Sequence, residues 1–330
     1  MAFDPGGPGD PLRGKRILIV GRDYYFYTRE IIAELRGTFG ASVMFRAIEP
    51  PSLVYRILKK AGIRLVWWLR RYHRSVIVAA QRETPDIVLF IQVHQIGVMV
   101  ESYRQAFQSA RFVLYYWDSL KTHHYLPYAK YFDRVCTFDR LDAAQIPEFE
   151  YLPLFFAERF RDLRKKRQMI YDMAFVGVAV SMRRYDQLLN VRAWAKANGI
   201  SLFDYVVVSP ILYFRRLLRG QLMREVHFKS LGEQELLMVY SSSRSVLDLP
   251  NNTQTGYTMR TFEALGAHRK LVTANRNVIN EDFYTAESVF VIGERGELPD
   301  RSFLDSEANF SSALESYFLR TWIGRLLRPH

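Results

Sequence analysis

Cysteine is almost absent from this sequence of 330 residues, which contains only Cys136. A single cysteine excludes an internal disulfide and any cysteine-rich metal site, and it makes a reducing cytoplasm the default location. Because Cys136 lies in the apolar run 135–138, we expect a buried structural thiol rather than a reactive one.

Long hydrophobic runs are also absent. Residues 1–10 contain acidic, glycine and proline residues but no apolar stretch, so the sequence predicts neither a signal peptide nor a membrane span there, only a flexible tail. No internal repeat has a fixed period, and no other segment is of low complexity. Because 49% of the residues are hydrophobic, the chain can form roughly two domains of ~150 residues, each with its own core.

Several catalytic signatures are missing as well. No Asp-x-Asp triplet follows a predicted strand, and no group of His, Asp and Glu has metal-ligand spacing. The nucleophile elbow of a Ser-His-Asp hydrolase is not present. The run that starts at Gly177, Gly-Val-Ala-Val, lacks the glycine fingerprint of a dinucleotide site. We therefore expect no metal and no other cofactor.

Positive charge, in contrast, is in excess, with a formal net charge of +12 and a pI near 9.7. Such a chain attracts an anionic partner, which can be nucleic acid, a membrane surface or a phosphorylated substrate. Residues 53–74 contain no acid and mix basic with apolar and aromatic side chains in an amphipathic pattern. The basic residues of this stretch are Arg56, Lys59, Lys60, Arg64, Arg70, Arg71 and Arg74, and the apolar ones include Leu53, Ile57, Trp67 and Trp68.

This pattern predicts helices that lie in the interface of an anionic membrane, with basic side chains among the headgroups. Residues 212–224 and 317–329 repeat the pattern on a smaller scale. An ordinary surface helix is the alternative for each of the three stretches. We assign the membrane contact to residues 53–74, and we expect no nucleic acid as partner because no recognised nucleic-acid module is present.

Short apolar runs alternate with helical patterns along the whole chain, which is typical of parallel α/β units. Turn residues such as Gly21, Gly40 and Pro85 separate the elements of the first half. We expect strands there at residues 16–20, 42–45, 86–91, 111–116 and 134–138, with a helix at 28–39. In the second half we expect strands at residues 173–176, 203–208, 226–228, 245–249, 270–273 and 289–292, with helices that begin at Met182, Glu233 and Met259.

A polar, basic stretch at residues 158–168 separates the two series of elements. We therefore expect a Rossmann-like domain at residues 1–156, a linker at 157–170, a second Rossmann-like domain at 171–303, and a helix at 304–330 that can pack back on the first domain. Doubly wound domains bind ligands at the carboxyl ends of their strands. Two such domains are expected to face each other across one interdomain cleft.

The most informative segment is 248–275, which runs from a strand through a polar loop and a helix to another strand. The loop and helix start around Gly256 and Thr258 offer backbone donors to a diphosphate, and Arg260 can add a fork of charged donors. One turn later, the carboxylate of Glu263 can accept both hydroxyls of a ribose. Gly266 then ends the helix. These features suit a nucleotide-sugar.

This segment resembles the motif QxGxTMRTFEALGxxKxLxTxN of bacterial GT-B glycosyltransferases that assemble capsule, lipopolysaccharide and exopolysaccharide. It departs from the motif at Tyr257, His268 and Ala274, where Leu, Gly and Thr are expected. Because His268 replaces a glycine, the turn after the helix can be less tight than in the motif. Shorter similarities extend the resemblance over roughly residues 110–295. The matching residues are Gln254, Gly256, Thr258, Met259, Arg260, Thr261, Phe262, Glu263, Ala264, Leu265, Gly266, Lys270, Leu271, Thr273 and Asn275.

The resemblance implies a GT-B fold with a donor site in the second domain, where Glu263 binds the ribose. It also implies that the loop after the first strand of that domain faces the diphosphate. Alternatively, Arg183 and Arg184 are a solvated helix start, and Glu263 is a capped or salt-bridged helix residue. The expected donor-binding residues are Glu263, Arg260, Gly256, Thr258, Tyr257, Gln254, Gly177, Ser181, Arg183 and Arg184.

The first domain is expected to hold the acceptor and a catalytic base, because the acceptor hydroxyl must lose its proton as it attacks the anomeric carbon. Asp118 has the best position, at the end of an apolar strand, although it can equally cap the segment that follows. His94 can be a packed polar group, and Asp23 can cap the next helix. The candidate bases are Asp118, His94, Asp23 and His123.

We therefore predict a metal-independent glycosyltransferase that moves a sugar from a nucleotide-sugar to a lipid-linked or growing saccharide acceptor in surface polysaccharide biosynthesis. Arginines and helix N-termini are expected to neutralise the leaving diphosphate. The expected location is cytoplasmic, at the inner face of the plasma membrane. The alternatives are a nucleotide-sugar epimerase or hydrolase of the same fold, a non-enzymatic nucleic-acid-binding or membrane-binding protein, and a GT-B-like assembly partner without catalysis.

Overall fold

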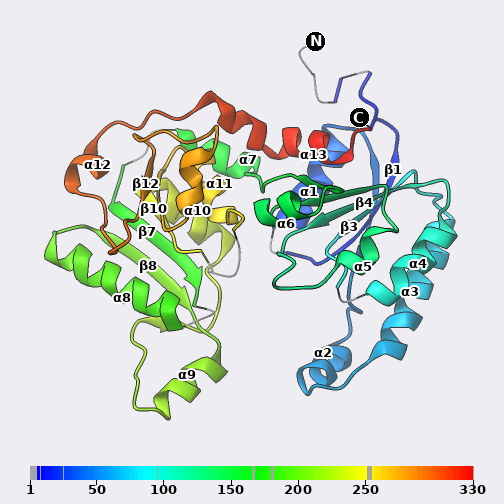
Figure 1. Cartoon of the computed structure of the whole chain (residues 1–330), viewed down its shortest axis with the longest axis horizontal. Helices are drawn as coiled ribbons and strands as arrows, with labels where there is room; N and C mark the ends of the chain where they lie inside the picture. Colours follow the sequence, from blue (N-terminus) through cyan, green and yellow to red (C-terminus); the bar gives the residue numbers. More distant parts are fainter. Residues whose placement is uncertain are drawn as a thin grey trace. The chain divides into compact units, whose positions relative to one another are not determined.

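The computed structural model describes residues 6–7, 9–24, 26–94, 96–165, 168–179, 182–250 and 255–329. The chain forms two compact units. The first comprises Met1–Pro153, Thr253–Gly256 and Leu319–His330, and the second comprises Leu154–Asn252 and Tyr257–Phe318. Each unit is built on one six-stranded parallel sheet flanked by helices (Figure 1). The predicted α/β class with two doubly wound domains is confirmed.

The sheet of the first unit has the strand order β2-β1-β3-β4-β5-β6, so its switch point lies between β1 and β3. All five predicted strands are present. The sixth was missed because its three residues form too short an apolar run. The strands are β1 (Arg16–Gly21), β2 (Ser42–Ala47), β3 (Ile87–Ile91), β4 (Arg111–Tyr116), β5 (Arg134–Thr137) and β6 (Phe149–Tyr151). The helices are α1 (Tyr27–Gly37), α2 (Leu53–Lys60), α3 (Val66–Gln81), α4 (Gly97–Ala106), α5 (Leu126–Ala129), α6 (Arg140–Gln145) and α13 (Leu319–Leu327).

The sheet of the second unit has the strand order β12-β11-β10-β7-β8-β9, with its switch point between β7 and β10. All six predicted strands are present. The strands are β7 (Tyr171–Val178), β8 (Leu202–Val207), β9 (Val226–His227), β10 (Ser243–Asp248), β11 (Lys270–Thr273) and β12 (Val289–Val291). The helices are α7 (Glu158–Arg161), η1 (Asp162–Arg164), α8 (Met182–Ala197), α9 (Pro210–Leu217), α10 (Glu233–Ser241), α11 (Met259–Gly266), η2 (Arg276–Asn280), α12 (Arg301–Asp305) and η3 (Ser312–Tyr317).

The core of the first unit shows why the central strands are continuous apolar runs. All five residues of β3 are buried, as expected for a parallel strand with helices on both faces of its sheet. Phe90 of β3 packs edge-on against Tyr103 of α4, with ring centroids 5.3 Å apart. Cys136 of β5 is fully buried, and burial raises the pKa of its thiol to about 12. The predicted structural thiol is confirmed.

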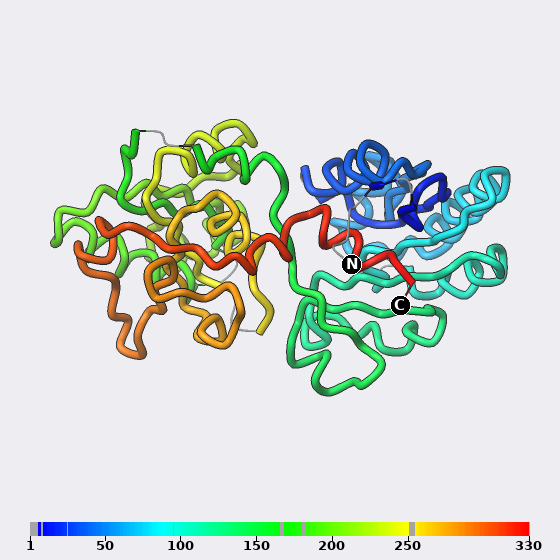
Figure 2. Tube along the Cα trace, turned by 90° about the horizontal axis from the view of Figure 1, so that it is seen from above, coloured from blue at the N-terminus to red at the C-terminus, as the bar shows by residue number. Residues whose placement is uncertain are grey.

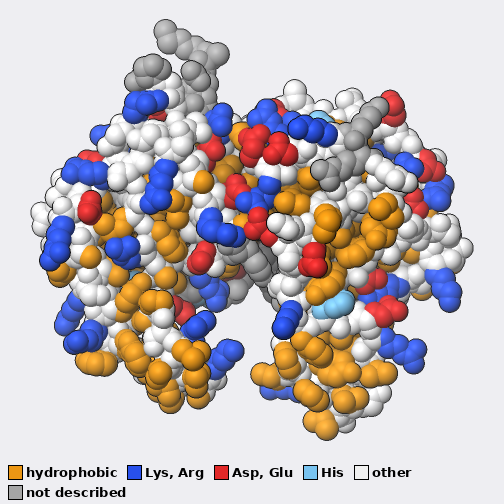
Figure 3. All heavy atoms as spheres, turned by 180° about the vertical axis from the view of Figure 1, so that it is seen from behind, with side chains coloured by type: hydrophobic (Ala, Val, Ile, Leu, Met, Phe, Trp, Pro, Cys, Tyr) orange, Lys and Arg blue, Asp and Glu red, His pale blue; other side chains and the backbone are white. Residues whose placement is uncertain are grey.

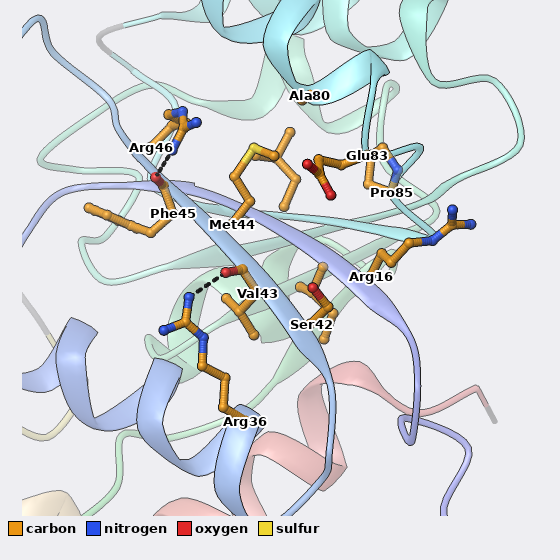
Figure 4. Close-up of a pocket in the computed structure, with 12 residues that line it drawn as sticks. Arg16, Arg36, Ser42, Val43, Met44, Phe45, Arg46, Ala80, Glu83 and Pro85 are labelled. Carbon is orange, nitrogen blue, oxygen red and sulfur yellow. Dashed lines mark hydrogen bonds between the residues drawn. The ribbon is translucent and has the colours of Figure 1, made fainter.

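Arginine side chains cover part of the free edge of the first sheet, which is strand β2. Arg36 of α1 donates from Nη2 to the Val43 carbonyl over 2.6 Å, and Arg46 donates from Nη1 to the Phe45 carbonyl over 2.9 Å. Both bonds lie in an open pocket of about 430 Å³ along the strand (Figure 4). Charged side chains at an edge protect it from pairing with a strand of another molecule.

Helix α13, in the C-terminal stretch 317–329, packs into the first unit instead of presenting its apolar face to solvent. Trp322 of α13 is 1% exposed, donates from Nε1 to the Pro153 carbonyl over 3.0 Å, and packs edge-on against Tyr115. Figure 2 shows α13 in red beside α1, where Arg320 pairs with Glu34 at 2.6 Å. Of the two alternatives for this stretch, the structure favours an ordinary helix of the fold, because the core of the first unit uses its apolar face.

Candidate functional site

The two central strands of the second sheet, β7 and β10, end side by side at its switch point. β7 ends with Gly177 and Val178, and β10 ends with Asp248. Helix α11 begins at Met259, after the loop that follows β10. Because doubly wound sheets bind ligands at the carboxyl strand ends of the switch point, this edge is the candidate donor site.

Two arginines are held at the carboxyl end of β7 by backbone carbonyls. Arg184, in the first turn of α8, donates from Nη1 to the Val178 carbonyl over 2.9 Å, and Arg260 donates from Nε to the Val176 carbonyl. A Cβ at Gly177 would lie 2.8 Å from Cζ of Phe175 and 3.4 Å from Nη2 of Arg260. The glycine therefore leaves room mainly for the Phe175 ring, with the Arg260 guanidinium at ordinary contact distance.

These two arginines make the strand end electropositive. Arg184 is 8% exposed, and burial lowers its pKa to about 10, with the charge of Arg260 acting in the same direction and Asp248 opposing it. Arg184 therefore keeps its proton at neutral pH. Two guanidinium groups this close together repel each other, and a bound anion would offset that repulsion.

Asp248 ties the start of α11 to β10. The side chain is 1% exposed, and its Oδ2 accepts from the hydroxyls of Thr258 and Thr261 at 3.0 and 3.1 Å. Thr258 is the N-cap residue, but its hydroxyl is used by Asp248 and does not cap the helix. The partial positive charge of the helix start favours an anion there.

Glu263 is a buried acid within the same cluster. It lies one turn into α11, is 3% exposed, and has the Tyr240 hydroxyl 3.4 Å from its Oε2. Burial raises the pKa of Tyr240 well above its usual value, and the Glu263 charge adds to this, so the phenol keeps its proton and donates. Arg260 and Asp248 also act on Tyr240. The carboxylate of Glu263 is therefore oriented within a network of opposite charges.

The side chain of Tyr257 belongs to the core of the second unit. It is 2% exposed, packs edge-on against Phe262 and Phe283, and donates its hydroxyl to Oε1 of Glu281 over 2.7 Å. Only the backbone of Tyr257 is thus suited to contact a ligand. The aromatic side chain at this motif position fills space and makes one internal hydrogen bond.

The other donor-site candidates differ in their surroundings. Gly256 is buried, and a Cβ there would lie 2.5 Å from the Phe138 ring, so the position accepts only glycine. Arg183 is exposed on α8, next to the buried Arg184. Gln254 and Ser181 lie outside the described residues.

In the first unit, polar side chains that follow β1, β3 and β4 form one chain of contacts. Gln92 donates from Nε2 to Asp118 Oδ2 over 2.6 Å and accepts from the Tyr24 hydroxyl at 2.9 Å. His123 Nε2 lies 3.8 Å from the same Asp118 oxygen. Gln92 is 1% exposed and has a φ of +69°. A left-handed backbone at a residue with a side chain costs about 1–3 kcal/mol and persists where the surroundings enforce it, often at functional sites.

A stacked pair of histidines continues this chain of contacts. The rings of His94 and His123 are 3.7 Å apart and nearly parallel, and Nδ1 of His94 lies 2.7 Å from the Tyr116 hydroxyl. Burial lowers the pKa of His94 to about 4, and the nearby His123 adds to this, while burial raises the pKa of Tyr116. At neutral pH both groups are therefore neutral, and the tautomer of the His94 imidazole decides which of the two donates this hydrogen bond.

Three of the four candidate bases, Asp118, His94 and His123, are thus brought together. Asp23 is exposed in the loop after β1 and takes no part in the chain of contacts just described. Gln92 was not among the residues predicted from the sequence. Its position could have indicated it, because it is a polar residue directly after the fully apolar strand β3. A carboxylate beside an imidazole can take a proton from a hydroxyl, so this cluster can supply a general base.

No group of three or more His, Cys, Asp or Glu side chains in the described ranges is placed to hold a metal ion. Nor is any helix of those ranges long and apolar enough to cross a membrane. The expectation that the protein uses neither a metal nor another cofactor stays a prediction.

Several solved structures resemble the whole chain. AviGT4, a glycosyltransferase involved in avilamycin A biosynthesis, has a TM-score of 0.55 and 13% identity over 94% of this chain and 93% of its own. The UDP-GlcNAc 2-epimerase of Methanocaldococcus jannaschii has a TM-score of 0.54 and 9% identity over 95% and 98%. An alpha-glucosyltransferase in complex with UDP and a 13-mer DNA has a TM-score of 0.52 and 13% identity over 79% and 81%.

These similarities establish the fold, which is of the GT-B type, shared by glycosyltransferases and by UDP-GlcNAc 2-epimerases. At such low identity they do not establish an activity. No protein-family model and no curated protein sequence matches the chain. The activity must therefore be argued from the residues at the strand ends.

Proposed function

We propose that the protein is a glycosyltransferase that moves a sugar from a nucleotide-sugar to a lipid-linked or growing saccharide acceptor in surface polysaccharide biosynthesis. The observation that carries the proposal is the arginine pair, Arg184 and Arg260, at the carboxyl end of β7. The reaction takes place at the cytoplasmic face of the plasma membrane and needs no metal ion.

The donor diphosphate is bound by Arg184, Arg260 and the start of α11. Each guanidinium can pair with phosphate oxygens through two parallel hydrogen bonds, and the helix start adds N–H donors and a partial positive charge. Glu263 accepts the ribose hydroxyls, because a carboxylate has acceptor sites for both. Tyr240 supports this role, since its hydroxyl, 3.4 Å from Oε2, holds the carboxylate in one orientation.

Asp118 acts as the base. It takes the proton of the acceptor hydroxyl as the hydroxyl oxygen attacks the anomeric carbon of the sugar. The bond between that carbon and the diphosphate oxygen breaks, and the nucleoside diphosphate leaves with the electron pair. The hydrogen bond from Gln92 and the nearby ring of His123 support this role, because they fix the position of the carboxylate. Arg184 and Arg260 neutralise the charge that develops on the diphosphate.

Helix α2 and the start of α3 bind the anionic membrane that carries the acceptor. Leu53, Ile57 and Trp67 are 64%, 56% and 72% exposed, a large apolar surface for helices in water. Figure 3 shows apolar side chains gathered over α2 at the lower left, with Lys and Arg side chains around them. Such a surface suits a lipid interface, where the basic residues contact headgroups.

A nucleotide-sugar epimerase is the second candidate, because the epimerase of M. jannaschii matches the chain about as well as AviGT4 does. The exposed surface of α2 and α3 favours the transferase, since the conversion of a soluble nucleotide-sugar needs no membrane contact. A role in nucleic-acid binding would instead show itself as oligonucleotide affinity that falls steeply with salt.

Product analysis by NMR distinguishes the two enzymes. The full chain is incubated with each of a panel of nucleotide-sugars, together with vesicles that contain bacterial lipid extract. A transferase releases nucleoside diphosphate and transfers the sugar to the lipid fraction, and Asp118→Asn abolishes the transfer while nucleotide-sugar binding is kept. Interconversion of the sugar while it stays attached to the nucleotide would identify an epimerase instead.

The membrane contact of α2 and α3 is tested separately by sedimentation with vesicles that contain phosphatidylglycerol. We expect the double variant Ile57→Ser/Trp67→Ser to bind these vesicles at least about tenfold more weakly than the wild type. Ile170→Ser is the matched control, because Ile170 is 59% exposed in the second unit. Equal binding by both variants would refute the membrane assignment without affecting the donor site.

A further inference from the structure

Helix α9 in the second unit presents its apolar residues to solvent. None of its eight residues is buried. Ile211, Phe214 and Leu218 follow the spacing i, i+3, i+7, which puts them on one side of a helix, and they are 66%, 60% and 87% exposed. Leu222 and Phe228 extend the apolar surface and are 55% and 52% exposed. An exposed apolar area of this kind marks a surface that another component covers.

Contacts on the inner side of α9 fix its orientation. Tyr213 packs edge-on against the half-exposed Phe228, with centroids 5.4 Å apart, and Met223 is 3% exposed. On the inner side, the Arg216 guanidinium lies over the Tyr185 ring of α8 at 5.9 Å. The outward apolar side is therefore a stable feature of the folded unit and not the result of a helix that has failed to dock.

Positive charge surrounds this apolar surface. Arg215, Arg219 and Arg224 are exposed. The only acid among residues 210–229 is Glu225, whose carboxylate pairs with Arg192 of α8 at 3.2 Å. Beside the helix lies an open, largely apolar hollow of about 610 Å³, and Figure 3 shows apolar side chains gathered over α9 at the lower right.

We propose that α9 and the turn after it, residues 210–228, form a second membrane-docking surface, which belongs to the second unit and binds anionic lipid. Phe214 and Leu218 enter the boundary between headgroups and acyl chains, while Arg215 and Arg219 contact the headgroup phosphates. The exposed stems of the arginines lie along the apolar surface and their charged ends reach the phosphates.

Charge argues for a lipid surface over a second copy of this chain. A symmetric dimer would place the same patch on both sides of the interface, so that Arg215 and Arg219 would face their own counterparts. Like charges brought together in an interface cost free energy. An anionic membrane can bury the apolar side chains and also pair its phosphates with the arginines.

With α2 and α3 on the first unit, the protein then has one docking surface on each unit. This inference does not depend on sugar transfer, because lipid binding is measured without a nucleotide-sugar.

Site-specific labelling tests the proposal directly. The single native cysteine, Cys136, is fully buried, so an environment-sensitive fluorophore attaches selectively to Leu218→Cys. We expect its emission to shift to the blue on vesicles that contain phosphatidylglycerol, and to do so much less on vesicles of phosphatidylcholine alone. Unchanged emission on both kinds of vesicle would overturn the proposal.

Sedimentation with the same vesicles measures how much residues 210–228 contribute to the affinity for the membrane. We expect Phe214→Ser/Leu218→Ser to lower the partition coefficient at least about tenfold, and Ile170→Ser to leave it unchanged. Adding Ile57→Ser/Trp67→Ser to the first pair is expected to abolish the remaining binding. If Phe214→Ser/Leu218→Ser lowers the mass of the protein in sedimentation equilibrium but leaves vesicle binding intact, the surface is a dimer interface and the proposal is wrong.

Discussion

The side-chain amide of Gln92 donates to Oδ2 of Asp118 over 2.6 Å, and Gln92 makes this contact from a backbone φ of +69°. Because the same side chain accepts from the Tyr24 hydroxyl, it bridges the loops that follow β1 and β4. Gln92 is therefore a positioning residue for the proposed base.

Replacing Gln92 by Ala should lower kcat by roughly tenfold to a hundredfold, because a displaced base loses its alignment with the acceptor hydroxyl. The KM for the nucleotide-sugar should stay the same, since the proposed donor site lies in the second unit. Steady-state assays of nucleoside diphosphate release measure both parameters.

Two comparisons make the Gln92 result specific. Asp118→Asn should lower kcat further than Gln92→Ala does, because it removes the base itself. Gln92→Gly relieves the left-handed backbone but also removes the amide, so it should resemble Gln92→Ala in kcat. Full activity of Gln92→Ala would contradict the role assigned to this hydrogen bond.

Arg260 should be required for binding the diphosphate. Removal of its guanidinium in Arg260→Ala should weaken the binding of UDP, GDP or dTDP, whichever the protein binds, by about tenfold to a hundredfold, since hydrogen bonds to charged groups are the strong ones. Isothermal titration calorimetry gives the affinities. Arg244→Ala is the matched control, because Arg244 is exposed at the start of β10, at the end opposite to the proposed donor site, and its loss should change the affinity by less than about threefold. Equal effects of the two substitutions would place the anion elsewhere.

Gly266 should be essential for packing at the end of α11. A Cβ there would lie 2.4 Å from the ring of Phe156 and 2.8 Å from its Cβ, so Gly266→Ala should lower the free energy of unfolding by about 1–3 kcal/mol. Gly37 ends α1 in the same way but has no atom within 4 Å of such a Cβ. Gly37→Ala should therefore be neutral or stabilising by up to ~1 kcal/mol. Urea denaturation compares the two, and equal stability of the variants would refute the close approach.

His73 should make stability fall in mild acid. It is fully buried, with Nδ1 2.7 Å from the Tyr103 hydroxyl and Nε2 3.0 Å from the Ile48 carbonyl, and burial lowers its pKa to about 4. In the unfolded chain this imidazole takes up a proton near pH 6.5, whereas in the folded protein it does so only near pH 4. The free energy of unfolding should therefore keep its full value above pH 6.5. It should fall as the pH drops toward 4, by about 3 kcal/mol for this residue.

The dependence is measured from urea midpoints at neutral pH and at pH values between 6.5 and 4. His73→Gln should be less stable at neutral pH but should show a shallower loss toward acid. His124→Gln, at an exposed position, should keep the full dependence. An unchanged slope in His73→Gln would show that other groups cause the acid sensitivity.

Most of the fold follows from local patterns in the sequence. Parallel strands buried on both faces are continuous apolar runs, and eleven such runs were assigned to strands that the structure contains. β6 has three residues, one of them Glu150, and gives no such run. For the C-terminal stretch, the sequence left a headgroup contact and an ordinary helix as alternatives. Arg320 pairs with Glu34 instead, and that ion pair depends on tertiary structure.

The residues of the proposed donor site are closer together in the sequence than those of the cluster in the first unit. Arg260 and Glu263 lie in one continuous motif that starts shortly after β10. Gln92, Asp118 and Tyr24 come from three separate loops, and only the sheet order places them together. His268 stands where the motif has Gly, and it takes the left-handed φ of +53° that a glycine would take after a helix. Its ring stacks on Phe310 with centroids 4.5 Å apart, a contact that sequence spacing does not reveal.

The central claim is that the second unit binds a nucleotide-sugar through Glu263 and the arginine pair. Isothermal titration of the full chain with a panel of nucleotide-sugars tests it most directly, with Glu263→Gln as the variant that keeps the size of this buried side chain. We predict that at least one nucleotide-sugar binds the wild type and that Glu263→Gln binds it about tenfold or more weakly, with an unchanged circular dichroism spectrum. Binding of no nucleotide-sugar, or equal affinity of the variant and the wild type, would contradict the account.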